Sequence, residues 1–99
     1  MSNVRALRIR ALPEGREQSF NGRFAWALSV LIGAGERGAT PIDHPGPRWS
    51  HYVHKLRRAG LEIETIAEEQ AGPYPGHHGR YVLRTAIEVV SIAEQETTI

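Results

Sequence analysis

The chain has 99 residues, of which 40% are hydrophobic and 23% are charged, and its net charge is +1. This composition excludes a disordered polyelectrolyte and predicts one small folded domain over residues 1–99. Cysteine is absent, which excludes disulfides and thiolate metal sites. The longest apolar run, Phe24 to Ile32, is much shorter than the roughly 20 residues that cross a bilayer, and no signal-peptide core precedes it, so we expect a cytoplasmic protein with no membrane partner.

The first predicted elements are a strand and an amphipathic helix. Residues 4–10 alternate apolar and basic side chains, as a half-buried strand does, and the polar residues 12–19 predict a surface loop. Residues 20–33 carry an apolar face at helical spacing and end at a glycine, which predicts a helix. Trp26 and Val30 fall on the opposite side of that helix. They need a cover, either from the N-terminal strand or from a second subunit, and in the second case they form a homodimer surface.

Two further helices are predicted next. Thr40 is a suitable N-cap and Pro45 blocks continuation, so residues 40–44 predict a second helix of little more than one turn. Residues 47–59 predict a longer third helix, which Gly60 ends in a left-handed C-cap. This third helix has an apolar arc on one side and basic residues on the other. It therefore packs by one face and offers cations and hydrogen-bond donors by the other.

The remaining residues predict a β-hairpin and one more strand. Residues 61–67 alternate in character, residues 68–79 are rich in proline and glycine and cannot continue the ladder, and residues 80–85 form the returning strand. Branched side chains over residues 86–93 favour an additional strand over a helix. We expect residues 94–99 to fray.

Charge is unevenly distributed along the chain. Residues 1–60 carry ten Lys or Arg and four Asp or Glu, whereas residues 61–99 carry two and seven. Between His44 and Leu61 there are four basic residues and no acidic one. A local basic patch of this kind favours a polyanionic partner.

A basic helix followed by a hairpin suits double-stranded DNA, because the major groove admits one helix and presents base-edge acceptors to its donors. The predicted DNA-binding residues are polar or cationic side chains of the third helix and the hairpin: Arg48, Ser50, His51, His54, Lys55, Arg57, Arg58, His77, His78 and Arg80. Those in the first turns of the helix would meet base edges, those in its last turn would neutralise phosphates, and those of the hairpin would contact the backbone or the minor groove.

The segment PGPRWSHYVHKLRRAGLEIET, followed by GHHGRYVL, resembles the small winged helix-turn-helix family common in bacterial and prophage genomes. In that family a helix is followed by a strand of pattern G-x-x-I-E-T, here Gly60 to Thr65, and by a return strand R-Y-V-L, here Arg80 to Leu83. The resemblance implies an α+β fold, a winged helix-turn-helix with a three-helix core, a small antiparallel β-sheet as the wing, and an N-terminal strand. It also implies sequence-specific DNA binding by a transcriptional or phage-related regulator. The very short second helix departs from the family pattern.

Other functions have weaker support in the sequence. Two histidine pairs, one on the third helix and one in the hairpin, suggest zinc, but no cysteine or matched acidic ligand accompanies them, so we predict no metal and no cofactor. No nucleophile, base and orienting group occur at a recognisable spacing, so we predict no enzyme. The alternative to DNA binding is a winged-helix adaptor that binds another protein through Trp26 and Val30.

Overall fold

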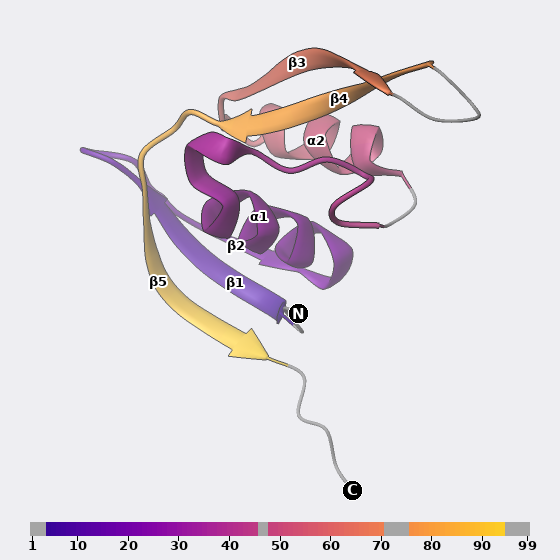
Figure 1. Ribbon diagram of the computed structural model, residues 1–99. Coiled ribbons are helices and arrows are strands. Elements are labelled where there is room, and N and C mark those ends of the chain that lie inside the picture. Colours follow the sequence, from indigo (N-terminus) through magenta and orange to yellow (C-terminus); the bar gives the residue numbers. More distant parts are fainter. Residues whose placement is uncertain (1–3, 46–47, 71–75, 95–99) are drawn as a thin grey trace, which may run out of the picture.

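The computed structural model describes residues 4–45, 48–70 and 76–94, which form two α-helices and two antiparallel β-sheets (Figure 1). In chain order the elements are β1 (Val4–Ala11), β2 (Glu17–Asn21), α1 (Gly22–Ala34), the short 3-10 helix η1 (Gly35–Arg37), α2 (Trp49–Arg58), β3 (Ile63–Gln70), β4 (Gly76–Leu83) and β5 (Ile87–Glu94). No helix within these described ranges is long and apolar enough to cross a membrane.

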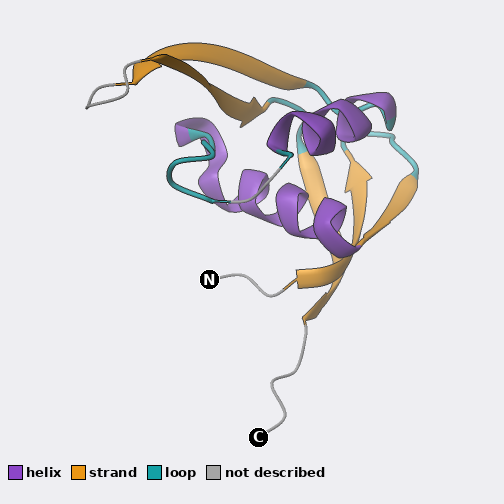
Figure 2. Ribbon diagram, turned by 90° about the vertical axis from the view of Figure 1, so that its right-hand side faces the viewer, coloured by secondary structure: helices purple, strands orange, loops and turns teal. Residues whose placement is uncertain are grey.

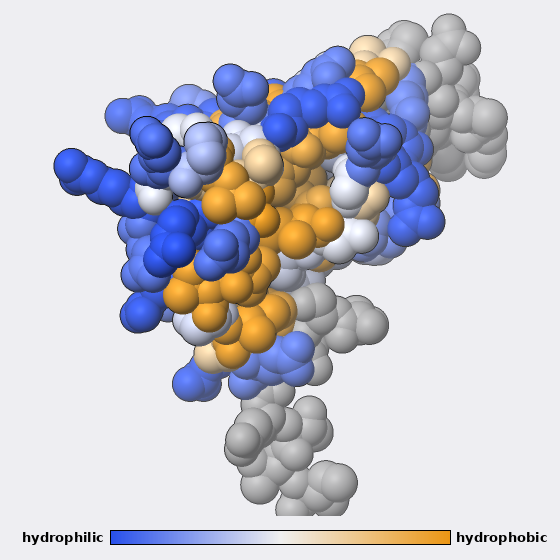
Figure 3. All heavy atoms as spheres, turned by 90° about the vertical axis from the view of Figure 1, so that its left-hand side faces the viewer, coloured by the Kyte–Doolittle hydropathy of each residue, from blue (hydrophilic) through white to orange (hydrophobic). Residues whose placement is uncertain are grey.

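The first sheet has the strand order β2-β1-β5, so the two ends of the described chain lie side by side. Leu7 and Ile9 on the central strand β1 are buried against α1, whereas Arg8 between them is exposed. On the edge strand β5, Ile92 is the register partner of Leu7 and Val89 that of Ile9. These two residues nevertheless remain 52% and 43% exposed. Apolar surface accordingly gathers on the side of the molecule that carries β5 (Figure 3).

The second sheet is the hairpin β3-β4, which projects beyond the two helices (Figure 2). Its register runs from Ile63 opposite Leu83 to Gln70 opposite Gly76. On the other side of β4, the backbone of Ala39 forms an isolated bridge to Tyr81. The segment between the helices is therefore tied to the hairpin.

The two helices pack together through one apolar face each. The buried residues recur at spacings of three and four, as one helical face requires. They are Ala25, Ala27, Leu28 and Leu31 of α1 and Trp49, Tyr52, Val53 and Leu56 of α2. The half-buried ring of Trp26 lies 5.3 Å from that of Trp49, so packing within the chain covers part of the side of α1 that the sequence left unexplained.

The expected three-helix core is wrong, because residues 40–44 form a turn and not a helix. The predicted cap does form: the Asp43 amide donates to the Thr40 hydroxyl at 3.0 Å, and the His44 amide donates to the Thr40 carbonyl at 2.9 Å. Pro45 has no amide hydrogen and disfavours helical backbone at the residue before it, so no second turn follows. The described residues contain two α-helices.

The N-terminal half contains a strand that was not predicted. Residues 17–21, expected to belong to a loop and to the start of a helix over residues 20–33, form β2. In this strand Phe20 pairs with Leu7 of β1 and packs partly buried against the core. Because β1 offers a free edge there, strand pairing prevails over helix extension, and α1 begins at Gly22.

The hairpin strands are shifted from the predicted 61–67 and 80–85, since β3 and β4 extend farther into the segment that was expected to be a loop. Residues 71–75 of that loop lie outside the described residues. The strand predicted over residues 86–93 is present as β5, one residue later. Residues 95–99 of the predicted tail are not described.

Candidate nucleic-acid interface

Helix α2 presents exposed polar side chains opposite its buried face. His54, Lys55 and Arg58 are all exposed and, at spacings of one, three and four residues, project on the same side of the helix. The ion pairs within the described chain engage other arginines, and none involves Arg48, Lys55 or Arg58. The positive charge of this surface is therefore not neutralised by carboxylates of the described residues.

Arg48 begins the helix from a left-handed backbone conformation, with φ 68°. The helix was predicted from residue 47 and instead starts at Trp49, with Arg48 as its N-cap. The Arg48 carbonyl accepts the amides of His51 at 3.0 Å and Tyr52 at 3.1 Å. These bonds close the first turn, from which the exposed side chains of Arg48 and Ser50 project.

Trp49 anchors this end of α2 in the protein. Its ring stacks on Tyr81 of β4, with centroids 6.0 Å apart and planes inclined by 19°. Its indole N–H donates to the His44 carbonyl at 2.8 Å. A buried aromatic residue with a satisfied polar atom fixes an element firmly, so the start of α2 is held in position by both the hairpin and the preceding turn.

His51 lies at the border between the exposed and the packed sides of α2. Its ring centroid is 5.8 Å from that of Phe24. Desolvation, followed by the positive charges of Arg48, Lys55 and His54, lowers the pKa of His51. The imidazole is therefore neutral at neutral pH and offers one donor and one acceptor. A phosphate placed nearby would oppose this shift and favour protonation.

Arg57 differs from its neighbour Arg58 because it bonds within the protein. Its Nε donates to the Ile63 carbonyl at 3.0 Å, and its Nη2 donates to the Thr65 hydroxyl at 2.8 Å. The guanidinium therefore ties α2 to β3. DNA contact by Arg57 stays a prediction, but the contacts that the structure shows for it are structural.

The cations of the hairpin are also paired. The Arg80 Nε donates to Glu68 at 2.6 Å, its Nη1 donates to the Arg37 carbonyl at 2.9 Å, and the hydrogen bond to Glu68 raises the pKa of Arg80. Arg84 pairs with Glu64 at 2.7 Å. Glu68 and Glu64 of β3 thus neutralise Arg80 and Arg84.

His77 and His78 belong to β4, where their backbones pair with Glu69 and Glu68. Their side chains lie outside what the structure describes, so their predicted DNA contacts stay predictions. Of the predicted residues, the structure brings six together along the exposed side and the first turn of α2: Arg48, Ser50, His51, His54, Lys55 and Arg58.

Sequence reasoning missed one cation beside this group. Arg23 at the start of α1 lies over the Trp26 ring, 4.0 Å from its centroid, and 5.9 Å from the ring of Tyr52 on α2. Only the packing of α1 on α2 places it there, and no local pattern could have revealed it. The assembled surface offers several donors and cations, which suit phosphate oxygens and base-edge acceptors. Within the described ranges, no group of three or more His, Asp or Glu side chains could hold a metal ion.

Comparison with known proteins gives one finding. The sequence model of one protein family, described as a winged helix domain, matches residues 17–93, which is most of the chain. Neither a curated protein nor a solved structure shows significant similarity to this chain.

Proposed function

Because the chain belongs to the winged helix domain family, whose fold is of the DNA-binding type, we propose that it binds double-stranded DNA sequence-specifically as a cytoplasmic transcriptional or phage-related regulator. The observation that carries the proposal is the set of cations on α2 without carboxylate partners among the described residues, on a helix with a fixed first turn. Elsewhere in the described chain Arg10, Arg80 and Arg84 are paired with acids, whereas the α2 cations gather on one helical surface that is available to a polyanion.

The side chains of α2 divide by position. Ser50, His51 and His54 lie nearer the start of the helix, and their side chains carry donors and acceptors that suit base edges. Lys55 and Arg58 lie in the second half, and their long cationic side chains suit phosphates, which position a protein without reading sequence.

Selection from a library of random duplexes tests this assignment. The wild-type protein should enrich a consensus. His54→Ala should relax the preference at one position of that consensus, by about 1–3 kcal/mol of discrimination. Lys55→Ala should instead weaken all duplexes about equally. Recovery of no consensus by the wild-type protein would contradict sequence-specific binding.

Protein contact is the second candidate function. The free edge of β5 suits such a contact better than the predicted surface at Trp26 and Val30. An exposed edge strand with apolar side chains is a template for pairing with another strand. Two copies of β5 paired antiparallel about a two-fold axis between Val90 and Ser91 would set Val89 of one copy against Ile92 of the other. Such a contact is self-complementary, as a two-fold dimer requires, and paired subunits suit DNA half-sites.

Sedimentation analysis of wild type and Ile92→Lys tests the dimer. Wild type should self-associate with increasing concentration, and the variant should remain monomeric, because a buried unpaired charge opposes the contact. Ile42→Lys is the matched control, since Ile42 is 53% exposed and Ile92 52% exposed, but Ile42 lies in the turn before α2. A monomeric wild type, or equal behaviour of the two variants, would contradict pairing through β5.

A further inference from the structure

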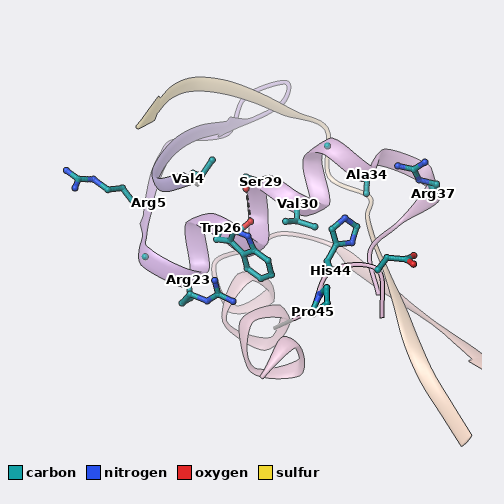
Figure 4. Close-up of a pocket in the computed structure, with 13 residues that line it drawn as sticks. Val4, Arg5, Arg23, Trp26, Ser29, Val30, Ala34, Arg37, His44 and Pro45 are labelled. Atoms are coloured by element: carbon teal, nitrogen blue, oxygen red, sulfur yellow. Dashed lines mark hydrogen bonds between the residues drawn. The ribbon is translucent and has the colours of Figure 1, made fainter. Parts of the chain in front are cut away.

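An apolar groove with cationic ends runs along the outer side of α1 (Figure 4). Its volume is about 830 Å³, within the range of small-molecule sites, which is about 300–1,000 Å³. Trp26, Val30 and Ala34 form one wall, and His44 and Pro45 of the turn before α2 form the facing one. The residues that the sequence marked as an unexplained apolar surface therefore line a hollow.

The charged residues that line the groove are mostly basic. Arg23 and Arg37 lie toward opposite ends of it, and Arg5 extends outward beside Val4 (Figure 4). Asp43 is the one acidic residue among the lining residues. Arg23 already lies over the indole of Trp26, at 4.0 Å from the ring centroid, so an anion bound at this end would meet a cation above an aromatic wall.

His44, one of the residues that line the groove, also has a buried polar atom without a partner in the described part of the chain. Among the described residues, the buried Nδ1 of His44 has no hydrogen-bond partner, which is unusual for a buried polar atom. An occupant with a polar group near His44 could satisfy it. Apolar walls, an excess of arginine and a polar atom without a partner together fit a ligand with an apolar body and an anionic head.

We propose that this groove binds a small amphipathic organic anion, such as an aliphatic or aromatic carboxylate, and that the occupant acts on α2. Two wall residues, Trp26 and His44, contact the first residue of that helix. The Trp26 ring lies 5.3 Å from that of Trp49, and the His44 carbonyl accepts the Trp49 indole N–H at 2.8 Å. An occupant that contacts Trp26 and His44 thus touches two of the groups that pack against or bond to Trp49, the first residue of α2. The effect on DNA affinity rests on the proposed function, whereas the binding itself does not.

Tryptophan fluorescence of the full chain measures binding without DNA, because the two tryptophans of the protein are Trp26 and Trp49. The probes are decanoate, decanol and decyltrimethylammonium below their micelle-forming concentrations, together with anilinonaphthalene sulfonate as an aromatic anion. The two anions should bind saturably, and the uncharged and cationic amphiphiles at least about tenfold more weakly, which corresponds to about 1.4 kcal/mol. Saturable binding by neither anion, or equal binding of all amphiphiles, would overturn the proposal.

Gly33→Leu is the sharpest variant. Gly33 lines the groove within α1, and a Cβ added there meets nothing within 4 Å. Leucine also favours helix over glycine. The variant should therefore melt no lower than wild type but lose the bound anion. Arg23→Gln should weaken anion binding several-fold, and Arg16→Gln, an exposed arginine outside the groove, should leave it unchanged. Undiminished anion binding by Gly33→Leu would place the anion elsewhere and overturn the site.

Titration of decanoate into a protein–duplex complex tests the link to α2. The duplex affinity should change in wild type and stay constant in Gly33→Leu, and the duplex should in turn change the affinity for decanoate by the same factor. An unchanged duplex affinity with saturable decanoate binding would overturn the link and leave the site standing. Failure to bind any duplex would contradict the proposed function, while the fluorescence titration would still decide the site.

Discussion

Arg57 and Arg58 are neighbours on α2, but only the Arg57 side chain bonds within the described part of the protein. Alanine at position 57 should therefore lower stability, and alanine at position 58 should weaken DNA contact. Arg57 donates to the Ile63 carbonyl and to the Thr65 hydroxyl. Hydrogen bonds from charged donors contribute about 1.5–3 kcal/mol each, and the exposure of Arg57 reduces this, so we expect Arg57→Ala to lower the free energy of unfolding by about 1–2 kcal/mol in total. Arg58 is exposed and forms none of the ion pairs or hydrogen bonds found among the described residues, so Arg58→Ala should change it by no more than about 0.5 kcal/mol.

Thermal unfolding followed by circular dichroism measures the difference. In a domain of this size, 1 kcal/mol corresponds to about 4–8 °C in Tm, so Arg57→Ala should melt at least about 4 °C lower than wild type. DNA binding should show the reverse ranking, with the larger effect in Arg58→Ala. Arg58→Ala should reduce the salt dependence of affinity by more than Arg57→Ala does, when both are measured well below their melting temperatures. Equal melting temperatures for the two variants would refute the structural role of Arg57.

Three further outcomes follow from single contacts. Folding lowers the pKa of His51, so the unfolded chain takes up the proton more readily, and stability is lost as pH falls through about 6.5. Urea titrations at several pH values should show a smaller loss of stability in His51→Gln than in wild type. An equal loss in the two proteins would contradict this role of His51. A Cβ added at Gly38 would meet the Tyr81 carbonyl at 2.8 Å, whereas a Cβ added at Gly60 would meet nothing within 4 Å, and both glycines have positive φ. Gly38→Ala should therefore destabilise by more than about 2 kcal/mol and Gly60→Ala by about 1–2 kcal/mol, and equal urea midpoints would argue against the close packing at Gly38. Thr40→Val removes the acceptor for the Asp43 amide in a residue that is 1% exposed, so its stability should fall by about 1–2 kcal/mol, and an unchanged urea midpoint would contradict this.

Side-chain periodicity predicted the elements whose character is local. The spacing of Trp49, Val53 and Leu56 identified the buried face of α2, and alternation identified β1. One local signal was overestimated, at residues 40–44. The cap at Thr40 forms as predicted, yet Pro45 limits it to a turn.

Non-local contacts account for what the sequence could not reveal. Phe20 has the spacing of a helix residue, but the free edge of β1 recruits it into β2. Arg57 and Arg58 look alike in the sequence, and only the position of the Ile63 carbonyl beside α2 distinguishes them. Likewise, the groove exists because the turn before α2 folds against α1 and brings His44 opposite Val30.

The salt dependence of duplex affinity tests DNA binding through α2 most directly. Wild type should show a steep negative slope of the logarithm of affinity against the logarithm of salt concentration, and the double variant Lys55→Ala, Arg58→Ala should lose about one unit of slope for each residue. Arg16→Ala, which removes an exposed arginine far from α2 in the sequence, serves as the control and should keep the wild-type slope. A double variant with an unchanged slope, or a wild type that binds no duplex at low salt, would contradict DNA binding by this surface.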